Sequence, residues 1–144
     1  MVEQDTVRLL RECDSGVRMG ISSIGDVIGH VSSPELERLL LDSSEEHERL
    51  KDDLQRLLDE YNDEGREPAA MAKGMSWLKT NIRLTADGSD STIADLMTDG
   101  CDMGIKSMSK YLNMYKAADE RSKDIAKRII SAEEALRAGV RAYL

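Results

Sequence analysis

The feature that most constrains the fold is a helical spacing of apolar residues in four long segments. In the first segment, apolar side chains recur at steps of three and four residues, which places them on one face of a helix. They are Leu10, Cys13, Val17, Ile21, Ile24, Ile28 and Val31. A similar spacing recurs within residues 36–61, 94–115 and 125–143. Runs of β-branched and aromatic residues are scarce, so the sequence predicts an all-α fold without a sheet.

Helix-boundary residues define most of the predicted elements. Ser33 can cap free N–H groups and Pro34 suits the first helical position, so one helix is expected over 4–31 and a second from 34 to about 61. We expect the Asn62–Gly65 segment to end the second helix, with Gly65 as a candidate terminator. A shorter helix is expected over 68–84, and the next long helix begins near Ser91.

The junction between the last two predicted helices has no glycine or proline to mark it. We place a turn between Lys116 and Ser122, where Asp119 or Ser122 could cap the final helix. A single long helix through this region is the alternative.

Length and charge limit the function classes. A chain of 144 residues is the size of one domain, here 1–144. The net charge of −8 argues against non-specific binding to nucleic acid or to anionic membranes, which needs a basic surface. No apolar run approaches the roughly 20 residues that span a bilayer, and the N-terminus lacks the pattern of a signal peptide. We therefore expect a soluble, cytoplasmic protein.

Two short motifs recur at a distance of 88 residues. In the first motif, Cys13, Asp14 and Gly16 recur as Cys101, Asp102 and Gly104. In the second, Ser43, Glu45, Glu46 and Arg49 recur as Ser131, Glu133, Glu134 and Arg137. If the repeat is a duplication, two helical hairpins, 4–61 and 91–144, pack around a pseudo-twofold axis. The helix over 68–84 would then return the chain along the bundle, as the long connection of ferritin-like bundles does.

This pattern resembles the ferritin-like superfamily. The whole chain is more closely similar to an uncharacterised family of small bacterial ferritin-like domains, in residues 13–18, 100–106 and 74–80. The resemblance implies an antiparallel four-helix bundle with an extra crossover helix between the second and third bundle helices. It also raises the question of a metal site, because the best-known ferritin-like proteins hold two metal ions.

The ligand pattern of such a di-metal site is incomplete in this chain. Ferritin-like di-metal proteins carry a Glu on each of two helices and Glu-x-x-His on each of the other two. Ser44, not Glu, stands three residues before His47, and the last helix has no histidine. The remaining metal-binding hypothesis is a mononuclear site that uses His47 with Asp14 or Glu133. The alternative is that His47 is a hydrogen-bonded structural histidine on an otherwise apolar face.

Both cysteines lie on predicted buried stripes. On antiparallel helices Cys13 and Cys101 would be about 12 Å apart along the axis, too far for a disulfide. No base is placed to activate either thiol, so both are expected to behave as small hydrophobes. Gly16 and Gly104 lie near the helix midpoints, where we expect them to permit close helix packing.

No phosphate-binding loop, catalytic triad or Cys-x-x-Cys motif is present in the sequence. We therefore expect no catalytic residue and no cofactor, and favour a non-catalytic interaction or structural module, with a homodimer as a candidate assembly. A degenerate metal-binding protein is the alternative, and a small-ligand carrier would require an apolar cavity. Met103 and Met114 lie off the main stripe, where they would dock the crossover helix or form a patch for a partner.

Overall fold

The computed structural model describes residues 2–63 and 89–144, and this part of the chain is all-α. It contains α1 (Val2–Ile28), α2 (Pro34–Glu60), α4 (Asp90–Met114), α5 (Glu120–Val140) and a short 3₁₀ helix, η1 (Arg141–Tyr143). The described residues include no strand, which confirms the all-α part of the prediction. The crossover helix predicted over 68–84 lies outside the described residues.

Side-chain caps start the helices where the sequence predicted. Ser33 accepts a hydrogen bond from the N–H of Leu36 at 3.3 Å, and Pro34 is the first residue of α2. Asp119 accepts one from the N–H of Ser122 at 2.8 Å and so caps α5. Because α4 ends at Met114, the predicted turn is confirmed and the single long helix is wrong.

The first helix is shorter than predicted, and the second ends close to its predicted bound. The first helix ends at Ile28 rather than at residue 31, and the N–H of His30 bonds back to the carbonyl of Val27 in a tighter turn. The second helix ends at Glu60, beside the predicted end near Tyr61, and Asn62 follows it with a φ of 54°, whereas Gly65 lies outside the described residues. Asparagine is one of the few residues other than glycine that tolerates this left-handed conformation, which lets the next N–H close the helix end.

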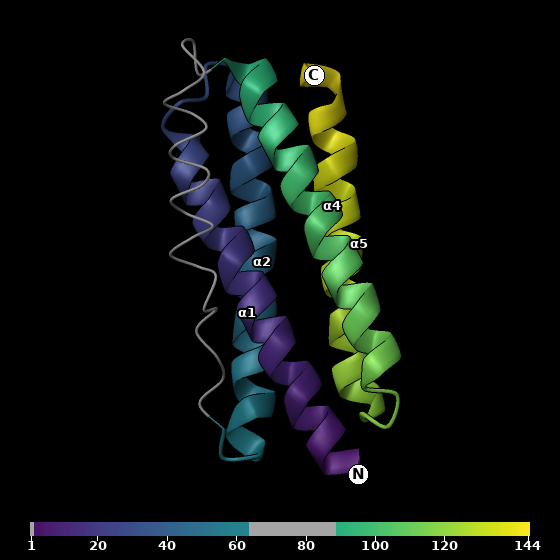
Figure 1. Ribbon diagram of the computed structural model, residues 1–144. Helices are drawn as coiled ribbons and strands as arrows, with labels where there is room; N and C mark the ends of the chain where they lie inside the picture. The colour runs from purple at the N-terminus through teal and green to yellow at the C-terminus, as the bar shows by residue number, and fades with distance from the viewer. Residues whose placement is uncertain (1, 64–88) are drawn as a thin grey trace.

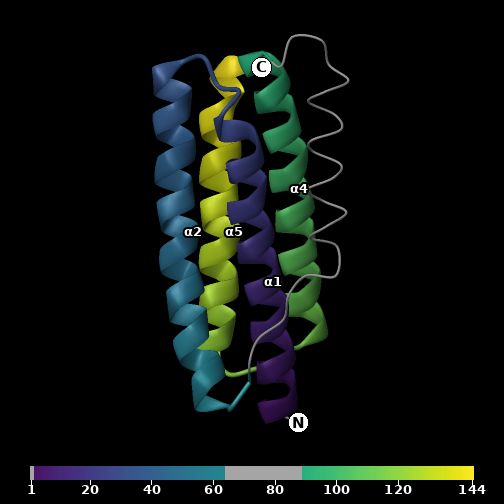
Figure 2. The same ribbon diagram turned by 90° about the vertical axis from the view of Figure 1, so that its left-hand side faces the viewer.

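The four helices form an elongated bundle of two antiparallel hairpins, α1–α2 and α4–α5 (Figures 1 and 2). Across the bundle, α1 packs against α4 and α2 packs against α5. At one end, the N–H of Ser33 donates to Asp90 at the start of α4 (2.9 Å). At the other end, the hydroxyl of Tyr61 donates to Asp119 (3.1 Å), and Asp119 N–H donates to Thr6 (2.8 Å). The end of α2 and the start of α4 therefore lie at opposite ends of the bundle.

The apolar core is divided along the bundle into two clusters of buried residues. The cluster near the α1–α2 turn includes Ile24, Val27, Leu36, Leu40, Ile93, Met97, Leu136 and Val140. The cluster near the α4–α5 turn includes Leu9, Val17, Leu50, Leu54, Leu58, Met108, Ile125 and Ile129. Burying each such side chain stabilises the folded state by about 1.5–3 kcal/mol. The apolar stripes of the four helices therefore hold the bundle together in both clusters. The level between the two clusters holds polar groups.

Candidate functional site

A buried histidine–carboxylate pair joins α2 to α5 between the two apolar clusters. His47 is fully buried, and the side chain of Glu133 is 11% exposed. The Nε2 atom of His47 lies 2.8 Å from Oε1 of Glu133. Two of the three residues proposed as metal ligands from the sequence are therefore in direct contact.

Both ring nitrogens of His47 face oxygen acceptors. Its Nδ1 atom lies 2.7 Å from the carbonyl oxygen of Ser43, one turn earlier in α2. A carbonyl can only accept a hydrogen bond, so Nδ1 carries a proton and donates it. At Nε2 the partner is the Glu133 carboxyl group, so a doubly protonated ring satisfies both oxygens. The arrangement favours an imidazolium–carboxylate pair.

The pKa of His47 reflects two opposing influences. Burial is the largest and lowers the pKa, because it removes water from the charged ring. The hydrogen bond to Glu133, the charge of that carboxylate and the Ser43 carbonyl act in the opposite direction. Together they outweigh burial, and the pKa of His47 is raised above its ordinary value.

Two glycines on the other helices border this pair. A Cβ atom at Gly20 of α1 would stand 2.7 Å from Cδ2 and 2.8 Å from Nε2 of His47. One at Gly104 of α4 would stand 3.5 Å from the carboxyl carbon of Glu133. Gly16 was predicted to permit close helix packing. A Cβ atom there would stand 3.4 Å from the Met108 side chain of α4, which agrees with that role. Gly20 therefore leaves space for the imidazole as well as for a neighbouring helix.

His47 and Glu133 occupy equivalent positions in the two hairpins. His47 stands 14 residues after Ser33, the N-cap of α2, and Glu133 stands 14 residues after Asp119, the N-cap of α5. The 88-residue echo would instead align Glu45 with Glu133. The second motif of the echo has an offset of 88 residues, whereas the N-caps of α2 and α5 are 86 residues apart. The echo is therefore two residues out of register with the starts of these helices.

The other acidic candidates have different partners. Asp14 is fully buried on α1, and Arg18 donates to it from Nε at 3.1 Å. Asp102 is half-exposed and pairs with Arg137 of α5 at 2.8 Å. Over residues 2–63 and 89–144, the structure groups no three His, Cys, Asp or Glu side chains in a geometry for one metal ion. The predicted mononuclear set of His47, Glu133 and Asp14 is thus divided between two places.

Both cysteines are free and buried, which confirms the predicted absence of a disulfide. Burial, aided by the charges of Glu12 and Asp14, raises the pKa of Cys13 to about 12. The pKa of Cys101 is also raised, first by burial and then by the charge of Glu133 and a hydrogen bond to it. Since the thiolate is the reactive form, neither thiol is prepared for nucleophilic chemistry near neutral pH.

The surface offers a shallow depression of about 350 Å³ on α5. Its lining residues are charged: Glu120, Arg121, Asp124 and Lys127. It therefore lacks the apolar lining that a small-ligand carrier needs.

Among the described helices, none has the length and apolar character needed to cross a bilayer. Comparisons with models of protein families, with curated proteins and with solved structures found no match for this chain.

Proposed function

We propose that this protein is a non-catalytic structural or interaction module built as a ferritin-like bundle. The observation that carries the proposal is that both ring nitrogens of His47 are bonded within the protein, to the carbonyl of Ser43 and to Glu133. A histidine in this state is a structural link between α2 and α5.

Metal binding would have to disrupt this link. A metal ion needs an unprotonated ring nitrogen, and the Ser43 carbonyl holds the proton on Nδ1. The Nε2 atom would have to lose its proton, and the Glu133 carboxylate would have to move to make room for the ion. Because the ring is fully buried, this rearrangement would also repack the core around it.

The position of the pair suggests what it contributes. Apolar contacts alone would permit α2 to shift along α5 by one helical turn, because apolar side chains would still contact apolar side chains. A single buried polar contact at one level penalises such a shift, because it would leave two buried polar groups without partners.

A degenerate metal-binding protein is the alternative function. The contact of 2.8 Å between His47 and Glu133 favours it, because histidine and carboxylate are common ligands of iron, manganese and zinc. In this alternative Asp14 would have to leave Arg18 and complete the site.

Elemental analysis of protein purified without an affinity tag separates the two functions. We expect no stoichiometric metal, and we expect the melting temperature to be the same with and without EDTA. The two variants His47→Ala and His30→Ala provide a matched comparison, because His47 is buried and His30 is exposed. One metal ion per chain that disappears in His47→Ala and persists in His30→Ala would overturn the proposal.

A further inference from the structure

One exposed face of α4 carries separated charges. Asp95, Asp99, Met103, Lys106 and Lys110 follow one another at steps of four, four, three and four residues, which places them on one helical face. All five are exposed, and Met103 is 67% exposed. The acidic residues lie in the first half of α4 and the basic residues in the second half.

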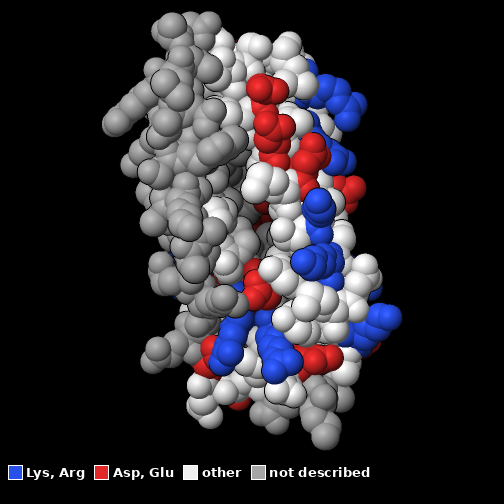
Figure 3. Space-filling view, viewed as in Figure 1, with Lys and Arg blue, Asp and Glu red and all other residues white. Residues whose placement is uncertain are grey.

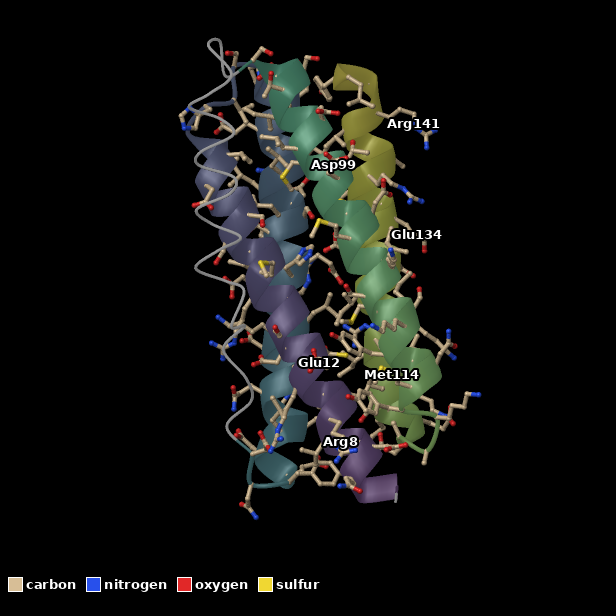
Figure 4. The ribbon with its side chains drawn as sticks, viewed as in Figure 1. Arg8, Glu12, Asp99, Met114, Glu134 and Arg141 are labelled. Atoms are coloured by element: carbon tan, nitrogen blue, oxygen red, sulfur yellow. The ribbon has the colours of Figure 1, made fainter. Side chains whose placement is uncertain are left out.

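The figures show this separation on the molecule. On the face drawn in Figure 3, acidic side chains gather over the upper part of α4, and basic side chains lie below them. Figure 4 labels Asp99 on the upper part of the same helix and Met114, which is 55% exposed, near its lower end. The face thus combines two opposite charges with exposed methionine.

Interactions within the bundle do not account for this pattern. Asp95 and Asp99 are like charges four residues apart, and so are Lys106 and Lys110; such pairs disfavour a helix slightly. Within the described part of the chain, none of these four side chains makes an ion pair. The helix dipole acts mainly on the first and last turns, whereas Asp99 and Lys106 are in the interior of α4.

A second copy of the chain has the complementary pattern. When two α4 helices are laid antiparallel with Asp99 opposite Lys106 of the other copy, Asp95 stands opposite Lys110, and twofold symmetry repeats both pairs. The same register brings Met103 of the two copies together at the twofold axis, where their apolar side chains can cover one another. A twofold dimer requires a surface that is complementary to itself, and an acidic half beside a basic half meets that condition.

We propose that this face of α4 is the docking surface for a second copy of the protein, in an antiparallel homodimer. The inference rests on the proposed function as an interaction module and names its partner. Residues 95–110 span about 24 Å of helix, so the contact belongs to the small, transient class of interfaces. Because its charged groups are exposed, the association should weaken as salt is added.

Sedimentation velocity of the full chain tests the surface. In buffer with about 20 mM salt and protein up to about 0.5 mM, we expect the mass to rise from 16.1 kDa towards twice that value. Raising the salt to about 500 mM should weaken the association and raise the dissociation constant by roughly tenfold. A wild-type protein that stays monomeric at low salt would overturn the proposed surface. It would not affect the metal analysis on which the proposed function depends.

Two charge-reversal variants locate the interface. Asp95→Lys with Asp99→Lys makes the whole face basic, and Lys106→Glu with Lys110→Glu makes it acidic. Each variant alone should remain monomeric under conditions where the wild type associates. An equimolar mixture should form a heterodimer, because the basic face of one variant meets the acidic face of the other. Homodimers of either variant, or a mixture that stays monomeric, would overturn the proposal.

A control on α2 separates the surface from net charge. Glu45 and Asp52 are exposed, and Glu45→Lys with Asp52→Lys gives the same net charge as the basic-face variant. We expect this control to dimerise like the wild type. Loss of the dimer in the control would show that α4 is not the site of contact, and circular dichroism of each variant verifies that the helices are retained.

Discussion

Replacing Gly20 by alanine probes the central pair without changing either member of it. The added Cβ would stand 2.7 and 2.8 Å from two ring atoms of His47, closer than non-bonded atoms can approach. The ring has little freedom to retreat, because it is fully buried and is bonded at both nitrogens. The substitution should therefore displace the imidazole from Glu133.

The magnitude follows from three contributions. Alanine in a helix interior is favoured over glycine by about 1 kcal/mol. Overpacking a core costs about 1–3 kcal/mol, and weakening a hydrogen bond to a charged group costs about 1.5–3 kcal/mol. The sum predicts that Gly20→Ala lowers the free energy of unfolding by about 1.5–5 kcal/mol.

Gly25→Ala is the matched control in the same helix. No atom lies within 4 Å of a Cβ atom placed at Gly25, so only the gain in helix propensity remains. This variant should raise the free energy of unfolding by about 0.5–1 kcal/mol. Urea denaturation followed by circular dichroism measures both variants. If Gly20→Ala is as stabilising as Gly25→Ala, His47 is not held where the structure places it and the reasoning is refuted.

The remaining predictions concern pH, thiols and a helix cap. The raised pKa of His47 contributes stability that is fully present below its unfolded value, about 6.5, and is lost as the pH rises through the folded value. Urea denaturation between pH 6 and 9 should show this decline in the wild type, and a similar decline in His47→Leu would contradict it. Cys13 and Cys101 should not react with a disulfide reagent at pH 8 until the protein unfolds, because both pKa values are raised; rapid labelling of the native protein would count against their burial. Asp119→Ala removes the cap of α5 and should cost about 1–2 kcal/mol in urea denaturation; an unchanged midpoint would show that the cap is dispensable.

The sequence identified the elements well, because helical spacing and caps are local signals. Ser33 and Asp119 stand beside apolar stripes of the correct period, so the starts of α2 and α5 could be located from neighbouring residues alone. Helix ends were less predictable. The apolar stripe of the first helix continues to Val31, but α1 stops at Ile28, where a tighter turn replaces the α-helical hydrogen bonds.

The central pair was only half predictable for a physical reason. His47 stood out as a polar residue on a buried stripe, but its contact with Glu133 crosses 86 residues of sequence and depends on the register of α2 against α5. In the structure both residues stand 14 positions after the N-caps of their helices, whereas the 88-residue echo aligned Glu45 with Glu133. Gly20 was harder still, because a residue without a side chain carries no signal of which neighbour uses its space.

A double-mutant cycle between His47 and Glu133 tests the central claim most directly. The four proteins are the wild type, His47→Leu, Glu133→Met and the double variant, each unfolded in urea with and without EDTA. Each single change should cost about 3–5 kcal/mol, because it leaves one buried polar group without its partner, whereas the double variant should lie close to the wild type. With the double variant near the wild type, the coupling equals the sum of the two single costs, about 6–10 kcal/mol, and we predict that EDTA does not alter it. A coupling near zero, or one that is lost when EDTA removes metal, would contradict the account of His47 and Glu133 as a structural pair.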